Sequence, residues 1–147
     1  MDRYLFLIFR FSIDNIFYLY LVICKEGWSP FAGLCYKRVA SLLSWPEARQ
    51  RCQEEAGVWA DLASIPDQRT STFLVSLLPV AGSYWVGGRY DEAAGAWQWT
   101  DGTPLSFSSW GGAPPGSSSG HQLAVRFSTG QWEQLPASQE RTFLCQY

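Results

Sequence analysis

The cysteines are the residues of this sequence with the clearest chemistry. The 147 residues include four of them, Cys24, Cys35, Cys52 and Cys145, and a single histidine, His121. A structural zinc site uses closely spaced pairs of cysteine and histidine ligands, and the sequence has no Cys-x-x-Cys pair. Four cysteines allow three pairings into two disulfides, of which Cys24–Cys35 with Cys52–Cys145 is the simplest. We therefore expect two disulfides, formed in an oxidising compartment.

The parts of an active site are missing from the sequence. A single histidine limits any Ser-His-Asp triad, and no pair of carboxylates stands out as a glycosidase pair. There is no phosphate-binding loop or dinucleotide fingerprint. The net charge is -2 and only 16% of the residues are charged, so the basic patch that nucleic acids require is also missing. The sequence predicts a protein that is not an enzyme and has no nucleic-acid partner.

The elements that would position these residues begin with two helices. Ser44 as N-cap, Pro46 in the first turn and Glu47 at the third position predict a helix start, and Gly57 predicts its end. A second helix is expected over residues 67–79, with a proline as its last residue. The inward residues would be Trp45, Ala48 and Cys52 in the first helix, and Phe73, Leu74, Leu77 and Leu78 in the second.

The rest of the chain reads as short strands and turns. Strand candidates lie within residues 26–39, and the second half adds the segments YWVGG, AWQWTDG, LAVRF and TFLCQY. Asp101-Gly102 is expected to be a turn rather than a catalytic carboxylate, and Arg89 to Glu92 a solvated charged loop. Residues 107–122 are rich in Gly, Pro and Ser and show no period. Such long loops are typically functional or disordered.

The N-terminal stretch has a different character. Residues 4–23, YLFLIFRFSIDNIFYLYLVI, are long enough to span a bilayer. Arg10 and Asp14 would each cost about 2.5 to 3.5 kcal/mol near the centre of a membrane helix, and no small-x-small cleavage site precedes Cys24. We expect residues 1–23 to be a hydrophobic leader, a signal anchor, a mis-joined segment or an extra strand. A membrane is a partner only if residues 4–23 act as an anchor.

From residue 24 to residue 147 the order of segments resembles the C-type lectin-like domain, in the long form that has an extra N-terminal hairpin. The matching segments are GWSPFAGLCYK, SWPEARQRC, ADLASIPD, YWVGG, WQWTDGTPLSFSSW, GQW and FLCQY. WTDGTPLSFSSW is also similar to single domains of the mannose-receptor group. The resemblance implies an α+β fold, with two helices packed on two small antiparallel sheets, a long irregular loop and disulfide staples. It also implies that Cys52 and Cys145 form the usual bond from helix to C-terminus.

A second disulfide of such domains crosses the long-loop region, and here its two positions hold Leu123 and Ala137. Because both replacements are apolar, the resemblance implies a coordinated loss that leaves a hydrophobic contact. The loop should then be looser than in domains that keep the cross-link.

The calcium site of sugar-binding relatives is also changed. Those relatives hold the ion with a Glu/Gln-Pro-Asn/Asp tripeptide and a Trp-Asn-Asp run, because Ca²⁺ prefers six to eight oxygen ligands. The matching positions read Ala113-Pro114-Pro115 and Trp132-Glu133-Gln134, so the tripeptide supplies no side-chain oxygen. We expect no cofactor, no metal and no calcium at the usual lectin site. The resemblance also implies that Pro114 could keep the cis peptide bond of relatives.

These observations predict a non-catalytic recognition module, secreted or at the cell surface, that binds an extracellular protein or glycan without calcium. The alternatives are a lectin with residual calcium dependence and a structural module of a larger receptor. Five tryptophans, Trp85, Trp97, Trp99, Trp110 and Trp132, are expected to pack in the core or on the sheet. The candidate ligand-binding residues on the long-loop face are Trp110, Ala113, Pro114, Pro115, His121, Glu133 and Gln134.

Overall fold

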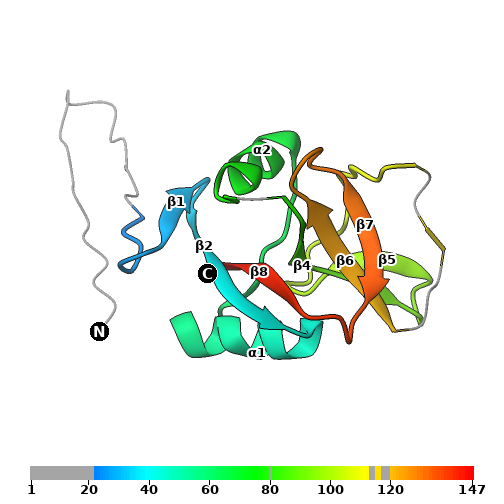
Figure 1. Ribbon diagram of the computed structural model, residues 1–147, viewed down its shortest axis with the longest axis horizontal. Coiled ribbons are helices and arrows are strands. Elements are labelled where there is room, and N and C mark those ends of the chain that lie inside the picture. The colour runs from blue at the N-terminus through cyan, green and yellow to red at the C-terminus, as the bar shows by residue number, and fades with distance from the viewer. Residues whose placement is uncertain (1–21, 80, 113–114, 117–119) are drawn as a thin grey trace, which may run out of the picture.

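The computed structural model describes residues 22–79, 81–112, 115–116 and 120–147 (Figure 1). The elements in chain order are β1 (Ser29–Phe31), β2 (Leu34–Leu43), α1 (Trp45–Ala56), β3 (Asp61–Leu62), α2 (Gln68–Ser76), β4 (Ser83–Asp91), β5 (Ala96–Trp99), β6 (His121–Arg126), β7 (Trp132–Pro136) and β8 (Arg141–Gln146). The leader, apart from residues 22 and 23, and the peptide bond at Pro114 lie outside the described residues, so the expectations for them stay predictions.

The strands form two antiparallel groups joined at one point. Strands β1, β2, β8 and β3 make one group, and β5, β4, β6 and β7 make the other. A single parallel pairing, Trp85 with Phe143, joins them into an eight-stranded sheet with the order β1-β2-β8-β4-β6-β7. Helices α1 and α2 lie on opposite sides of this sheet (Figure 1). The fold is the α+β arrangement that the resemblance implies, with two helices packed on antiparallel strands.

Helix α1 begins and ends where the sequence predicts. The Glu47 carboxylate accepts hydrogen bonds from the N–H of Ser44, at 3.0 Å, and from the Ser44 hydroxyl. The carbonyl of Ala137 accepts the N–H of Trp45, so the first turn of the helix is tied to the end of β7. Gly57 follows the last residue with φ +105, a conformation that favours glycine. The inward residues Trp45, Ala48 and Cys52 are buried as expected.

Helix α2 is shorter than the sequence suggests. Asp67 caps it by accepting the N–H of Thr70 at 2.7 Å, but the helix ends at Ser76 rather than at Pro79. The N–H groups of Leu77 and Leu78 donate to the carbonyls of the residues three positions earlier in the chain. The chain therefore leaves the helix through a tighter turn before it reaches the proline. Of the four predicted inward residues, Leu74 and Leu78 are buried, whereas Phe73 and Leu77 are half-buried.

The core has one cluster on each side of the sheet. The α2-side core contains Tyr36, Ala63, Ile65, Leu74, Leu78, Tyr84, Val86, Trp99, Leu123, Val125, Trp132 and Leu144. The α1-side core contains Trp28, Cys35, Val39, Trp45, Ala48, Cys52, Leu62, Trp85, Ala124, Phe143 and Cys145. Successive residues of β6 and β8 fall alternately into the two clusters, as the pleat of a strand requires. The central strands are therefore covered on both faces, which explains their nearly continuous apolar sequences.

Two disulfides hold this arrangement, and their pairing is the simplest one allowed by the sequence. Cys24 bonds to Cys35, 11 residues later, and closes the N-terminal hairpin. Cys52 bonds to Cys145, 93 residues later, and connects α1 to the last strand.

The expected contact between Leu123 and Ala137 is wrong. Leu123 lies opposite Gln134 in the β6–β7 ladder and belongs to the α2-side core. Ala137 packs against the α1-side core, and its N–H donates to the carbonyl of Gly120 at 2.7 Å. Three residues of strand separate Leu123 from Gly120, about 10 Å along the chain, and the two side chains lie on opposite faces. An alignment of residue spacings could not reveal this register.

Candidate ligand-binding face

The described part of the long loop is attached to β5 at Pro115. The indole Nε1 of Trp97 donates to the carbonyl of Pro115 at 3.0 Å. Pro115 is half-buried, whereas Ala113 and Pro114 lie outside the described residues. Of the predicted proline-rich tripeptide, the structure therefore places one residue beside the indole of a neighbouring strand.

Aromatic rings form most of this face. The rings of Trp99, Phe107 and Trp110 each contact Trp132 edge-on, with centroid distances of 5.3, 5.6 and 5.6 Å. Trp110 also lies 5.2 Å from Trp97. Trp99 and Trp132 are buried, as is Trp85 on the other side of the sheet, which confirms their expected role in packing. Trp97 and Trp110 are half-buried, so part of each indole remains accessible to a ligand.

Glu133 is engaged by protein groups rather than left open for an ion. Its carboxylate accepts hydrogen bonds from the Ser83 hydroxyl and from the guanidinium of Arg126. Burial raises the pKa of the Glu133 carboxyl, but these hydrogen bonds outweigh burial and hold its pKa below the ordinary value. Arg126 was not among the predicted site residues. The signal available in the sequence was the alternating segment LAVRF, which contains Arg126, followed by a turn and the segment with Glu133. Together they indicate a hairpin that could bring Arg126 and Glu133 close.

The remaining two candidates lie at separate points of the β6–β7 hairpin. His121 begins β6 opposite Pro136 and is half-buried. Gln134 lies opposite Leu123, next to Glu133 in sequence, so the two side chains start from opposite faces of β7. The structure does not bring His121, Glu133 and Gln134 together into one cluster.

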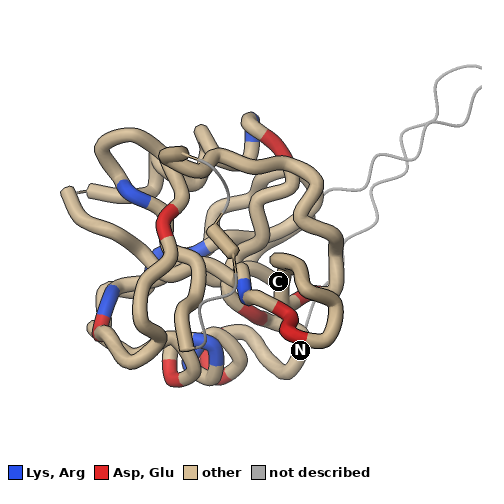
Figure 2. Tube along the Cα trace, turned by 90° about the vertical axis from the view of Figure 1, so that its right-hand side faces the viewer, with Lys and Arg blue, Asp and Glu red and all other residues tan. Residues whose placement is uncertain are grey.

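Two aspartates that the sequence predicts in polar loops or turns, Asp91 and Asp101, accept hydrogen bonds from groups of the protein. Asp91 accepts the N–H groups of Ala93 and Ala94 at 2.9 and 3.1 Å and forms the turn before β5. Asp101 accepts the N–H of Thr103, which confirms the expected turn, and also accepts hydrogen bonds from Ser64 and Gln146. Acidic and basic residues are scattered over the described trace rather than gathered by sign (Figure 2).

Within the described ranges, no group of three or more His, Cys, Asp or Glu residues is placed to hold a metal ion. In the same part of the chain, no helix is long and apolar enough to cross a membrane. The sequence from Gly116 to Gly120 reads GSSSG and matches a serine nucleophile elbow in letters only. Such an elbow joins a strand to a helix, whereas the element after Gly120 is strand β6.

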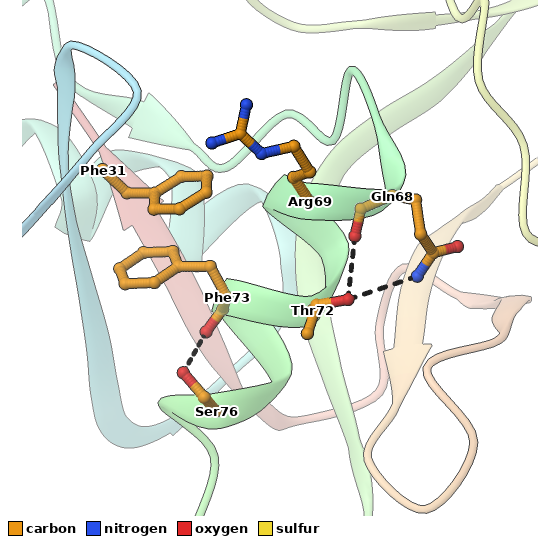
Figure 3. Close-up of a pocket in the computed structure, with 6 residues that line it drawn as sticks. All are labelled: Phe31, Gln68, Arg69, Thr72, Phe73 and Ser76. Atoms are coloured by element: carbon orange, nitrogen blue, oxygen red, sulfur yellow. Dashed lines mark hydrogen bonds between the residues drawn. The ribbon is translucent and has the colours of Figure 1, made fainter.

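A shallow groove of about 420 Å³ lies away from the long loop, between the β1–β2 hairpin and α2 (Figure 3). Phe31 from the hairpin and Phe73 from the helix stack at 4.4 Å with an interplanar angle of 6° and form its wall. The guanidinium of Arg69 extends from the helix toward the side of Phe31. The hydroxyls of Thr72 and Ser76 donate to carbonyls of their own helix. Sequence reasoning did not predict this groove, because it treated Phe73 as a core residue.

Comparison with known proteins agrees with this architecture. The family model described as the Lectin C-type domain matches residues 41–147. C-type lectin domain family 17, member A, from Homo sapiens is 30% identical over 125 residues, which are 85% of this chain and 32% of that protein. A type-2 ice-structuring protein from Hemitripterus americanus is 37% identical over 92 residues, which are 63% of this chain and 53% of that protein. The chain thus spans about a third of the length of the first of these curated relatives and about half of the second.

Solved structures show the same fold over most of the chain. The crystal structure of a calcium-independent type II antifreeze protein superposes with a TM-score of 0.75 at 28% identity, covering 85% of this chain and 94% of that one. The chain belongs to the C-type lectin domain family.

Proposed function

We propose that this chain is an extracellular recognition module that binds a protein or glycan ligand without calcium and catalyses no reaction. The observation that carries the proposal is the state of Glu133, whose carboxylate is bound by Ser83 and Arg126. The tripeptide at 113–115 adds no side-chain oxygen, so an ion at the usual lectin position would lack most of the six to eight ligands that Ca²⁺ requires. The calcium-independent antifreeze structure supports the proposal, because it shows that this fold can dispense with the ion in a related protein.

The ligand would contact the long-loop face through the accessible parts of Trp97 and Trp110, next to Pro115. Aromatic side chains anchor protein partners in this way, and they also stack on the apolar faces of sugars. Ala113, Pro114, His121 and Gln134 complete the proposed surface. Glu133 would act by fixing the β6–β7 hairpin rather than by touching the ligand.

The proposed location follows from the covalent chemistry of the domain. Disulfides form and persist in oxidising compartments, and all four cysteines of the chain are paired. Residues 1–23 would direct the chain to that compartment as a leader or an anchor, and residues 24–147 would be the recognition domain.

Thermal unfolding of the full chain with calcium and with EDTA tests the proposal. A specific ion stabilises the native state, by about 2.7 kcal/mol at a hundredfold excess over its dissociation constant. We expect the same unfolding midpoint under both conditions. The matched control restores the ligand types of sugar-binding relatives through Ala113→Glu, Pro115→Asn, Glu133→Asn and Gln134→Asp, and should gain a calcium-dependent rise. A rise of several degrees in the unaltered chain would instead establish a calcium-dependent lectin.

Ligand class is then decided by binding in the presence of EDTA. Glycan-array binding that survives the chelator and is lost in Trp110→Ala would identify a glycan ligand, whereas binding to cells stripped of glycans would identify a protein. Loss of both signals would leave the module a structural part of a larger receptor.

Ice is a second candidate ligand, because two relatives are named type-2 ice-structuring proteins and two solved relatives are type II antifreeze proteins, one calcium-independent and one calcium-dependent. Thermal hysteresis of the full chain, measured with EDTA present, tests it directly. A freezing point equal to the melting point would remove ice from consideration.

A further inference from the structure

The turn after α1 exposes two large apolar side chains. The N–H of Ala60 donates to the carbonyl of Gly57 at 2.9 Å, so residues 57–60 form a turn with Val58 and Trp59 at its tip. Val58 is 78% exposed and Trp59 is 92% exposed. Turn tips normally contain Gly, Pro, Asn, Asp or Ser, and their side chains favour water. A Val-Trp pair at such a tip therefore indicates a surface that meets an apolar environment.

This turn lies where the apolar N-terminal stretch enters the domain. The ammonium group of Lys25 donates to the carbonyl of Ala56, the last residue of α1, at 3.1 Å. Val22 and Ala56 both pack against the α1-side core, and Ile23 is 53% exposed. The chain enters the described domain on the side where α1 ends (Figure 1). The start of the described chain, the turn and Lys25 therefore lie on one side of the molecule.

We propose that the Val58–Trp59 turn inserts into the interface of a lipid bilayer; the inference rests on residues 4–23 acting as the membrane anchor that their length and apolar sequence allow. Tryptophan favours this depth, because its ring is apolar and its N–H can reach the headgroups. The occupant is lipid because the sequence of residues 4–23 is long and apolar enough to span a bilayer, and the described chain begins with its last two residues, Val22 and Ile23, on the side of the turn.

Charge makes little contribution to this contact. Lys25 is followed by Glu26, and Arg51 near the end of α1 pairs with Glu54 and Glu55. Since the charges are balanced, zwitterionic lipid should suffice and raised salt should not weaken the contact.

Quenching by brominated lipid tests the proposal on the full chain. Residues 1–23 contain no tryptophan, so all emission from the eight tryptophans comes from the domain. The chain is reconstituted into phosphatidylcholine vesicles with and without bromine on the acyl chains. We expect bromine to quench part of the emission, and Trp59→Leu to reduce this loss at least about twofold, because the other tryptophans are buried or half-buried. Val58→Ser should reduce it in the same direction.

Leu42 provides the matched control. It is 61% exposed and lies just before α1, at the other end of a helix of 12 residues, about 18 Å away. The emission that Leu42→Trp adds should not be quenched by the bromine.

Three results would overturn the proposal. The chain could fail to float with the vesicles, Trp59→Leu could leave the quenching unchanged, or the added tryptophan at position 42 could be quenched equally. Protection of Trp59 from iodide without quenching by bromine would assign the turn to a second copy of the chain instead of to lipid.

Discussion

At the scale of single residues, Ala32 has an unfavourable backbone conformation that a substitution can relieve. It occupies the first central position of the two-residue β1–β2 turn with φ +48, and Gly33 follows with φ +84. Two positive φ values define the type I′ turn, which prefers Asn-Gly, and alanine in this region costs roughly 1 kcal/mol. Ala32→Asn should therefore raise the free energy of unfolding by about 0.5 to 1 kcal/mol in urea denaturation.

The matched control for that substitution is Ala40→Asn. Ala40 is exposed in the neighbouring strand β2 and has no positive φ. Asparagine is disfavoured in strands, so this variant should be neutral or less stable. Equal effects of the two substitutions would show that turn conformation is not the cause.

Asp101 links pH to stability. Burial raises the pKa of its carboxyl, but hydrogen bonds from Thr103, Ser64 and Gln146 more than compensate and hold the pKa below its ordinary value. A carboxyl whose pKa is lower in the folded state than in the unfolded state stabilises the fold at pH values above its unfolded pKa of about 4. This stability is lost as the pH falls through the folded pKa. Asp101→Asn replaces an acceptor by a donor facing the Ser64 hydroxyl. It should cost about 1 to 2 kcal/mol at pH 7, a figure reduced for partial solvent exposure, and the difference should shrink below about pH 4.

Urea denaturation at pH 7 and at pH 3 measures this difference. Glu140→Gln, which neutralises an exposed carboxylate, serves as the control and should change neither value. A cost of Asp101→Asn that stays the same at both pH values would assign its effect to packing rather than to charge.

Residue types alone predicted part of the candidate site. The sequence showed that Ala113–Pro115 lacks oxygen ligands, because this depends only on which side chains are present. It could not show that Glu133 is held by Ser83 and Arg126, which lie 50 and 7 residues away and meet only when the strands pair.

At the scale of elements, α2 is attached to the N-terminal hairpin by stacked rings. Phe31 and Phe73 stack at 4.4 Å, and Tyr36 contacts Phe73 edge-on at 5.6 Å. Aromatic pairs contribute about 0.5 to 1.5 kcal/mol beyond the area that they bury. A double-mutant cycle with Phe31→Ala and Phe73→Ala should give a coupling energy of this size in urea denaturation.

A cycle between Phe31 and Phe107 is the control. Both side chains pack against the α2-side core, but Phe107 contacts Trp132 and not Phe31. Their effects should add within about 0.5 kcal/mol. Coupling of equal size in both cycles would mean that loss of the core as a whole, and not the stacked pair, sets the measured energy.

The elements show where sequence patterns succeed and where they fail. The start of α1 was predictable, because Ser44 and Glu47 act on each other within one turn. The end of α2 was not, since Pro79 marks only the last position that a helix could reach and the turn at Leu77 depends on packing. The register that places Ala137 beside Gly120 rather than Leu123 is a long-range property, and no local pattern encodes it.

At the scale of the whole molecule, the two disulfides should differ in their effect on stability, because they close loops of different length. Cys52–Cys145 encloses 93 residues and connects α1 to β8, whereas Cys24–Cys35 encloses 11. Loop-closure entropy gives about 4.7 kcal/mol for the first and about 2.8 kcal/mol for the second. Replacing Cys52 and Cys145 by alanine should thus cost about 2 kcal/mol more than replacing Cys24 and Cys35.

Urea denaturation of the two double variants measures this difference, and removal of buried sulfur needs its own control. Cys35, Cys52 and Cys145 are fully buried, so each double replacement by alanine also leaves a cavity, and the Cys52 and Cys145 variant removes two buried sulfur atoms. Reductant added to the unaltered chain breaks both disulfides but keeps every sulfur atom. The free energy of unfolding of the reduced chain should fall by nearly as much as the sum of the losses in the two double variants. If the Cys24 and Cys35 variant proves the more costly, the N-terminal hairpin and not the link from α1 to β8 is the main covalent support of the domain. The long-loop face would then depend on the sheet alone for its position.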